Sequence, residues 1–194
     1  MDKFGLIGKN ISYSFSKEYF KNKFKDESIL NAVYQNFDIQ NIEEFPEILK
    51  ANPTLKGLNV TIPYKESVIS FLDEMDPKAS KIGAVNTIKI STNGKLKGYN
   101  TDYYGFSKSL QPHLKQHHKK ALILGTGGAS KAIAYALREL KIEIAFVSRN
   151  PTKETTYTYD SLTENDIKNH QIIVNCTPLG TAPDIDKYPD IPYQ

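Results

Sequence analysis

The sequence predicts an α/β protein that consists of two domains with mostly parallel sheets. Segments with strand patterns alternate with segments of helical periodicity, which is the order that crossover helices between parallel strands produce. Polar and basic residues at 112–120 interrupt this alternation, and an aliphatic run at 121–124 follows them. Because such runs are typical of strands buried on both faces, a second sheet is expected to begin there. The predicted domains are residues 1–114 and 115–194, a length that can hold one good core or two small ones.

Composition narrows the class of protein. A hydrophobic content of 39% and a charged content of 24% describe a globular protein, and the net charge of +3 suits anionic small molecules rather than nucleic acid. The N-terminal apolar run is too short for a signal peptide or a membrane span. Cys176 is the only cysteine, and the histidines lack metal-site spacing. We therefore expect a cytoplasmic protein in a reducing compartment, with no metal and no membrane or nucleic-acid partner.

In the first domain, strands and helices alternate in pairs. Ser16 is the predicted N-cap of the first helix, and Pro63 ends the third strand because it cannot donate to a ladder. Asn93-Gly94 between two strand patterns predicts a hairpin. The expected strands are 4–8, 33–39, 57–62, 84–90 and 95–99, and the expected helices are 17–24, 42–50, 65–74 and 103–114.

The second domain begins with a buried strand that leads directly into a glycine-rich turn and a helix. A second aliphatic strand and a third follow, whereas residues 151–170 are polar and have too weak a pattern for an assignment. The expected strands are 121–124, 142–147 and 172–174, and the expected helix is 131–140.

The turn at 125–130, Gly-Thr-Gly-Gly-Ala-Ser, is the motif of the second domain that points to a ligand. Glycines let the backbone approach a pyrophosphate, and the helix N-terminus that follows supplies N–H donors. Ser130 replaces the last glycine of the usual pattern, but a small residue there still permits close helix packing. Alone, such a cluster is more often a simple turn; between a strand and a helix it predicts a Rossmann-type dinucleotide site.

The end of the second strand in this domain distinguishes between the two nicotinamide dinucleotides. NAD sites usually carry an acid there, which holds the ribose 2′-hydroxyl, whereas NADP sites carry a cation for the 2′-phosphate. Ser148 and Arg149 stand at this point, Lys153 follows, and there is no acid. A solvated arginine is the alternative, but it leaves the missing acid unexplained. The sequence therefore favours NADP.

In the first domain, Asn59, Thr61 and Lys65 gather near one predicted strand-to-helix turn. An amide, a hydroxyl and an ammonium group in that arrangement suit a small, hydroxylated anion, although this segment alone favours the simpler interpretation of a polar strand face with a solvated lysine. Ser14 and Ser16 precede a helix N-terminus, where their hydroxyls could bind an anion or merely cap the helix. These two interpretations stay open.

Lys65 and Asp102 form a second candidate pair. Reduction of a ketone by hydride leaves an alkoxide that must gain a proton, so a general acid is needed. A lysine beside a carboxylate can serve if burial brings its pKa towards neutrality. The sequence does not establish that these two residues meet.

Taken in order, the motifs closely resemble those of the shikimate dehydrogenases, NADP-dependent enzymes of aromatic amino-acid biosynthesis. The similar segments cover essentially the whole chain: G-L-I-G with S-Y-S-F-S, N-V-T-I-P-Y-K, G-A-V-N-T, Y-N-T-D, G-T-G-G-A-S, S-R-N and N-C-T-P-L-G. The resemblance implies an N-terminal substrate domain, a C-terminal NADP domain, and reversible reduction of 3-dehydroshikimate to shikimate.

The resemblance also implies roles for particular residues. Lys65 would be the catalytic acid and base, with Asp102 as its partner. The residues expected to bind substrate are Ser14 and Ser16 at the carboxylate, and Asn59, Thr61, Lys65, Asn86 and Asp102 around the ring hydroxyls. Those expected to bind the cofactor are Gly125, Thr126, Gly127, Gly128, Ala129 and Ser130 at the pyrophosphate, Ser148, Arg149 and Lys153 at the 2′-phosphate, and Thr177, Pro178 and Leu179 beside the nicotinamide.

Family members continue well beyond the point where this sequence stops, so we expect the C-terminal domain to be incomplete. We also expect the protein to be a monomer or a homodimer. Two alternatives to the leading function are a quinate/shikimate dehydrogenase of relaxed specificity and a non-catalytic substrate-binding fragment. Arg149 argues against a quinate/shikimate dehydrogenase that uses NAD. The pair of Lys65 and Asp102 argues against a non-catalytic fragment.

Overall fold

The computed structural model describes residues 1–150, 152–153, 155–182 and 184–193, and it divides into two compact units, Met1–Thr101 and Asp102–Gln194. The division falls earlier than the predicted boundary at 114/115. The reason is helix α4 (Asp102–Leu110), which packs along α5 (Gly128–Glu139) of the second unit. Phe106 and Leu110 contribute apolar side chains to the core around α5. This packing places residues 102–114 with the second sheet.

The first unit contains a six-stranded sheet in the order β2-β1-β3-β5-β6-β4. β1 pairs in parallel with both β2 and β3, which confirms the predicted parallel core, and β5 and β6 form the predicted antiparallel hairpin. The elements are β1 (Asp2–Gly8), α1 (Ser16–Asp26), β2 (Ala32–Asp38), α2 (Phe45–Ala51), β3 (Leu55–Val60), β4 (Glu74–Met75), α3 (Pro77–Ile82), β5 (Thr87–Ile90) and β6 (Leu96–Tyr99).

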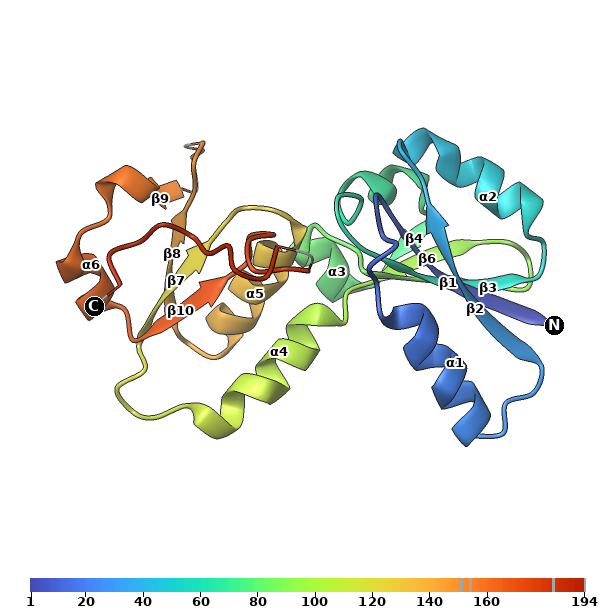
Figure 1. Cartoon of the computed structure of the whole chain (residues 1–194), viewed down its shortest axis with the longest axis horizontal. Coiled ribbons are helices and arrows are strands. Elements are labelled where there is room, and N and C mark those ends of the chain that lie inside the picture. Colours follow the sequence, from blue (N-terminus) through green and yellow to red (C-terminus); the bar gives the residue numbers. More distant parts are fainter. Residues whose placement is uncertain (151, 154, 183, 194) are drawn as a thin grey trace. The chain divides into compact units, whose positions relative to one another are not determined.

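Helices α1 and α2 lie on opposite sides of this sheet (Figure 1). The main core lies on the α2 side, around the fully buried Phe45, Val68 and Val85. A smaller aromatic cluster on the α1 side joins Phe20 and Phe24 to Tyr34 of β2. Each face of the sheet is therefore anchored by its own apolar contacts, and the carboxyl ends of β1 and β3 stay at the rim.

The second unit is built on a four-stranded sheet in the order β10-β7-β8-β9, and all its pairs are parallel. Numbered within the unit this order is 4-1-2-3, which is that of the first strands of a dinucleotide-binding sheet. The predicted Rossmann-type arrangement is confirmed. Its elements after α4 are β7 (Lys120–Leu124), α5, β8 (Glu143–Val147), β9 (Thr155–Tyr157), α6 (Glu164–Asn169) and β10 (Ile172–Asn175).

Two local expectations are wrong. The predicted helix at 65–74 is a turn followed by a 3-10 helix, Ser67–Phe71, since Ile69 N–H bonds to the Glu66 carbonyl and Leu72 N–H to that of Ile69. The segment is short, contains the adjacent β-branched residues Val68 and Ile69, and has no side-chain hydrogen bond at its N-cap, Glu66; these features favour this tighter geometry. Ser16 is the first residue of α1 rather than its N-cap, which is Phe15. The Ser14 hydroxyl instead accepts the Ser16 N–H at 3.3 Å.

The sequence analysis missed helices α3 and α6, although residues typical of a helix N-terminus precede each of them. Asp76 caps α3 by accepting the Lys78 N–H, and Pro77 occupies its first turn. Thr163 and Asp166 form a capping box at the start of α6. Both helices have six residues, which is too short for a periodicity to emerge.

Within the residues that the structure describes, no helix combines the length and apolar character needed to cross a membrane. The same part of the chain contains no cluster of His, Cys, Asp and Glu side chains suited to a metal ion.

Candidate active site

The first unit has a topological switch point at the carboxyl ends of β1 and β3. The chain leaves β1 towards β2 on one side, whereas β3 lies on the other side of β1. Ligands of open α/β sheets bind in the crevice that such divergence creates. The segment after β1 carries Ser14 and leads to Ser16, and the segment after β3 carries Thr61 and Lys65. The topology therefore brings four of the predicted substrate residues to one rim of the sheet.

Main-chain hydrogen bonds hold the two segments together at this rim. Thr61 N–H donates to the Ile7 carbonyl at 2.9 Å, and Lys9 N–H donates to the Ile62 carbonyl at 3.1 Å. A Cβ added at Gly8 would lie 2.5 Å from the Thr61 Cγ2 atom and 2.6 Å from the Ile11 Cγ2 atom. Glycine at the end of β1 is thus what allows the two segments to approach.

Replacing Gly8 by alanine is expected to destabilise the protein by about 1–3 kcal/mol, as overpacking does in well-packed sites. Thr61 and Ile11 carry short branched side chains that cannot move aside without shifting their backbones. Urea unfolding followed by circular dichroism would measure the change. Gly105→Ala is the control, because no atom lies within 4 Å of the added Cβ on α4. That variant should be neutral or stabilising, and equal destabilisation by both would contradict the proposed crowding.

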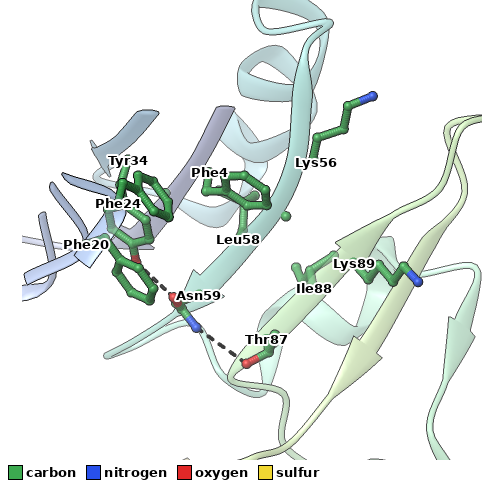
Figure 2. A pocket seen from close by; sticks show the side chains of 12 residues that line it. Phe4, Phe20, Phe24, Tyr34, Lys56, Leu58, Asn59, Thr87, Ile88 and Lys89 are labelled. Carbon is green, nitrogen blue, oxygen red and sulfur yellow. Dashed lines mark hydrogen bonds between the residues drawn. The ribbon is translucent and has the colours of Figure 1, made fainter. Parts of the chain in front are cut away.

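A chain of polar side chains crosses the sheet at the same rim. The Tyr34 hydroxyl donates to Asn59 Oδ1 at 2.9 Å, and Asn59 Nδ2 donates to Thr87 Oγ1 at 3.4 Å (Figure 2). Thr87 Oγ1 in turn donates to Asn86 Oδ1 at 3.1 Å. Asn59 and Asn86, two predicted substrate residues, therefore belong to one connected network.

Asn86 is the most firmly held member of the network. Its carbonyl accepts the Val60 N–H at 2.8 Å, its N–H donates to the Tyr99 carbonyl at 3.0 Å, and its Oδ1 accepts the Thr101 N–H at 2.8 Å. The Asn86 Nδ2 group also donates to Thr101 Oγ1 at 2.9 Å. These bonds fix the amide plane, so the orientation of its donor and acceptor is set before any ligand arrives.

Lys65 sits on a turn that is anchored on both sides. Its carbonyl accepts the Val85 N–H at 2.7 Å, and the hydroxyl of the buried Tyr64 donates to the Ile39 carbonyl at 2.8 Å. Lys65 is half-buried. Asp102 is the first residue of α4 and belongs to the second unit, so its pairing with Lys65 stays a prediction.

A cavity of about 310 Å³ opens on the α1 face of the same sheet. Figure 2 shows Phe4, Phe20 and Phe24 in its wall, with Asn59 and Thr87 close to one another and Lys56 and Lys89 further out. The mostly apolar wall offers few hydrogen-bonding groups to a molecule covered with hydroxyl groups. The polar network that borders the cavity, rather than the cavity itself, has the chemistry to bind such a molecule.

The second unit has its own switch point, between β7 and β10. Gly125 follows β7 with φ of 103°, a conformation that favours glycine, and its N–H donates to the Val147 carbonyl at 2.8 Å. A Cβ there would lie 3.3 Å from the Cys176 carbonyl oxygen of the segment after β10. The close approach of the two segments and the start of α5 at Gly128 make the cradle that a pyrophosphate requires.

Ser130 shows how a serine replaces the usual third glycine. It is fully buried, and its hydroxyl donates to the Gly127 carbonyl at 2.6 Å within the first turn of α5. The buried hydroxyl is therefore satisfied locally, and α5 still packs closely against the sheet.

The cationic residues follow β8 as predicted from the sequence. Ser148 is buried and its N–H donates to the Tyr157 carbonyl at 3.1 Å, whereas Arg149 and Lys153 are exposed. Burial raises the pKa of the Tyr159 hydroxyl, and the nearby Arg149 guanidinium opposes that rise. Arg149 thus places a positive charge near Tyr159 just after β8, where a 2′-phosphate would bind.

Asn175 organises the segment that carries Thr177, Pro178 and Leu179. Its Oδ1 accepts from the Thr177 N–H at 2.9 Å and from the Thr177 hydroxyl at 2.7 Å, and its Nδ2 donates to the Leu179 carbonyl at 3.0 Å. Sequence analysis did not assign this residue a role. The only available signal was an asparagine followed by Cys-Thr-Pro at a strand end, which is typical of a side-chain-stabilised turn.

Tyr34, Thr87 and Thr101 were also missed in the first unit. Each lies in or next to a strand, where tyrosine and threonine are the residues that strands favour. Their participation in one network depends on pairing between distant strands, such as Asn59 opposite Thr87. No local pattern contains that information.

Comparisons with known proteins agree with this geometry. The family model described as the shikimate dehydrogenase substrate binding domain matches residues 6–88. A shikimate dehydrogenase (NADP(+)) of Clostridium botulinum is 44% identical over 186 residues, which cover 91% of this chain and 71% of that protein.

Among solved structures, shikimate dehydrogenase 1 from Peptoclostridium difficile has a TM-score of 0.80 and 36% identity, with 95% of this chain and 70% of that chain covered. The Thermus thermophilus shikimate 5-dehydrogenase in complex with NADP(H) and shikimate has a TM-score of 0.83 and 30% identity, with 99% and 74% covered.

Proposed function

Because the chain belongs to the NADP-dependent shikimate dehydrogenase family, we propose that its two units act as a substrate domain and a cofactor domain in the reversible reduction of 3-dehydroshikimate to shikimate. It is an oxidoreductase of the shikimate pathway of aromatic amino-acid biosynthesis. The family model for the substrate domain lies entirely within the first unit, which supports the first assignment. The glycine cradle of the second unit supports the other.

The observation that carries the substrate assignment is the polar network at the rim of the first sheet. Shikimate has one carboxylate and three ring hydroxyls, so its site must offer several donors at fixed spacing. The hydroxyls of Ser14 and Ser16 suit the carboxylate. Asn59 and Asn86, whose amides are held by the network, suit the ring hydroxyls. Thr61 and Asp102 complete the proposed set.

Lys65 is the proposed acid and base. In the direction of reduction its ammonium group donates a proton to the oxygen of the former ketone, which develops negative charge as hydride arrives at carbon. In the opposite direction the neutral amine accepts the hydroxyl proton. Asp102 is proposed to hold the Lys65 ammonium group in line with that oxygen.

The residues of the second unit fit NADP. Bound NADPH would supply the hydride. The backbone at 125–130 and the start of α5 would hold the pyrophosphate, with Gly125 leaving the space that a side chain would fill. Arg149, together with Ser148 and Lys153, would bind the 2′-phosphate. Thr177, Pro178 and Leu179, on the segment that Asn175 fixes, would border the nicotinamide.

The remaining proposals concern the protein's surroundings. We propose a cytoplasmic enzyme, monomeric or homodimeric, with a small-molecule substrate and no nucleic-acid or membrane partner. The interspersed charges and the net charge of +3 support the absence of a nucleic-acid site.

The function is tested by following NADPH absorbance as shikimate is added to the protein with NADP. We expect turnover with shikimate and NADP, and little with quinate or with NAD. Comparable rates with quinate and NAD would favour the relaxed dehydrogenase instead. Shikimate binding by calorimetry without turnover would favour the non-catalytic fragment, and an absence of binding would refute the proposed substrate.

A further inference from the structure

Tyr34 is a buried tyrosine whose hydroxyl lies inside the substrate network. It comes from the middle of β2 and is only 5% exposed. Its ring stacks on that of Phe20 from α1, with centroids 4.4 Å apart and planes 13° from parallel. Both the strand and the helix therefore fix where the hydroxyl points.

The hydroxyl reaches a residue that is distant in sequence. It donates to Asn59 Oδ1 at 2.9 Å. A phenolic oxygen has one proton, and that proton is used in the bond to Asn59. The ring, stacked on Phe20 of α1, therefore sets the position of the group that holds the Asn59 amide on β3.

This arrangement decides which atoms face a ligand. Because Asn59 Oδ1 is occupied by the Tyr34 proton, the Asn59 amide presents its two N–H donors on the other side, and one of them reaches Thr87 at 3.4 Å. The second N–H is the donor from which a ring hydroxyl oxygen of the proposed substrate would accept.

We propose that Tyr34 is a positioning residue for substrate recognition: its hydroxyl holds the Asn59 amide in the orientation that presents an N–H donor to a ring hydroxyl. This inference rests on the proposed function of Asn59. Tyr34 itself contacts no reacting atom in this scheme. Burial raises the pKa of its hydroxyl far above the working range of an enzyme, and the Ser16 side chain opposes that rise only in part. The bond to Asn59 is therefore independent of pH between about 6 and 9.

The first test is Tyr34→Phe, which keeps the ring on Phe20 and removes the bond to Asn59. We expect the Kd for shikimate and its KM to rise roughly tenfold, since one hydrogen-bonded arrangement is lost. The value of kcat should change less than about threefold, and the Kd for NADP should be unchanged. The ratio of the variant's KM to the wild-type KM should be constant from pH 6 to 9.

Asn52→Ala is the matched control. Asn52 Nδ2 donates to the Ile48 carbonyl at 2.9 Å, near the start of β3 and at the opposite end of that strand from the network. The variant loses this hydrogen bond and the one that Asn52 Oδ1 accepts from Lys3 Nζ at 2.9 Å, and it leaves the rim unchanged. If Tyr34→Phe only weakens the fold, both variants will lower Tm and leave the shikimate Kd within twofold of wild type, and the proposal is wrong.

A second test is a double-mutant cycle. Tyr34→Phe and Asn59→Ala should be non-additive in their effects on shikimate Kd, because Tyr34 acts through the Asn59 amide. Tyr34→Phe with Ser14→Ala is the matched pair, and it should be closer to additive because the Ser14 hydroxyl bonds to the Ser16 N–H instead. Equal additivity of both pairs would refute the proposal. If the wild-type protein does not bind shikimate, both the proposed function and this inference are wrong. If it binds shikimate and the Kd does not change in Tyr34→Phe, only this inference is wrong.

Discussion

Lys65→Met is expected to lower kcat by roughly 10²–10⁴-fold while shikimate still binds, because the variant keeps an unbranched side chain and loses the only group proposed to move the proton. The turn beneath it should persist. Its anchor is the Lys65 carbonyl, which accepts the Val85 N–H, and this main-chain bond does not depend on the side chain. On the other side of the turn the Tyr64 hydroxyl donates to the Ile39 carbonyl, and the Lys65 side chain takes no part in that bond either.

Single-turnover measurement of NADPH formation separates this loss from slow product release, and calorimetry gives the Kd for shikimate. Lys56→Met is the control: it removes the same charge from an exposed position on β3, outside the proposed site. A near wild-type rate in Lys65→Met would show that the acid is misassigned. A loss of affinity as large as the loss of rate would mean that Lys65 binds substrate rather than transferring a proton.

The parts of the fold that the sequence predicts well are those whose information is local. The aliphatic run of β7, the glycines after it and the periodicity of α5 lie within about twenty residues, and together they identify a dinucleotide-binding unit. The hairpin of β5 and β6 follows from Asn93-Gly94 in the same way. In each case one short segment determines its own backbone.

Two placements that depend on particular contacts between distant segments were not predicted. Helix α4 has a helical pattern wherever it packs, and only its contact with α5 assigns it to the second unit. The segment after Lys65 has the apolar spacing of a helix, yet its residues form a 3-10 turn that fills the core of the first unit. Periodicity reports which side chains are buried, but it does not distinguish one tight turn from another.

The same difference between local and long-range information applies to the candidate site. Asn59 and Arg149 stand at or next to strand ends and Lys65 on the turn after β3, where polar side chains are conspicuous, and the sequence proposes them as site residues. Tyr34 and Thr87 lie within strands and resemble ordinary strand residues, although they bond to the Asn59 amide. Residues proposed to contact a ligand are therefore easier to select from sequence than the residues that orient them.

Arg149→Asp is expected to lower kcat/KM for NADP by about 10²–10³-fold and to raise the NAD activity relative to it. A charge-assisted hydrogen bond to phosphate contributes roughly 1.5–3 kcal/mol, and the reversal adds repulsion between the aspartate and the 2′-phosphate. The same carboxylate can accept the 2′-hydroxyl of NAD, which is the usual arrangement at this position. Arg149 is exposed, so the replacement should not destabilise the fold.

The decisive comparison is with Arg138→Asp, the same change at the other arginine of the sequence. Arg138 lies exposed in the last turn of α5, at the opposite end of that helix from the glycine cradle. If the net charge steered NADP to the protein, both variants would lose activity alike, and the loss would fade as ionic strength rises. If Arg149 binds the 2′-phosphate directly, only its replacement will affect kcat/KM, and the ratio of NADP to NAD activity will change with it. An unchanged ratio of NADP to NAD activity in Arg149→Asp would show that another group binds the 2′-phosphate. Arg149 would then not be the cause of a preference for NADP.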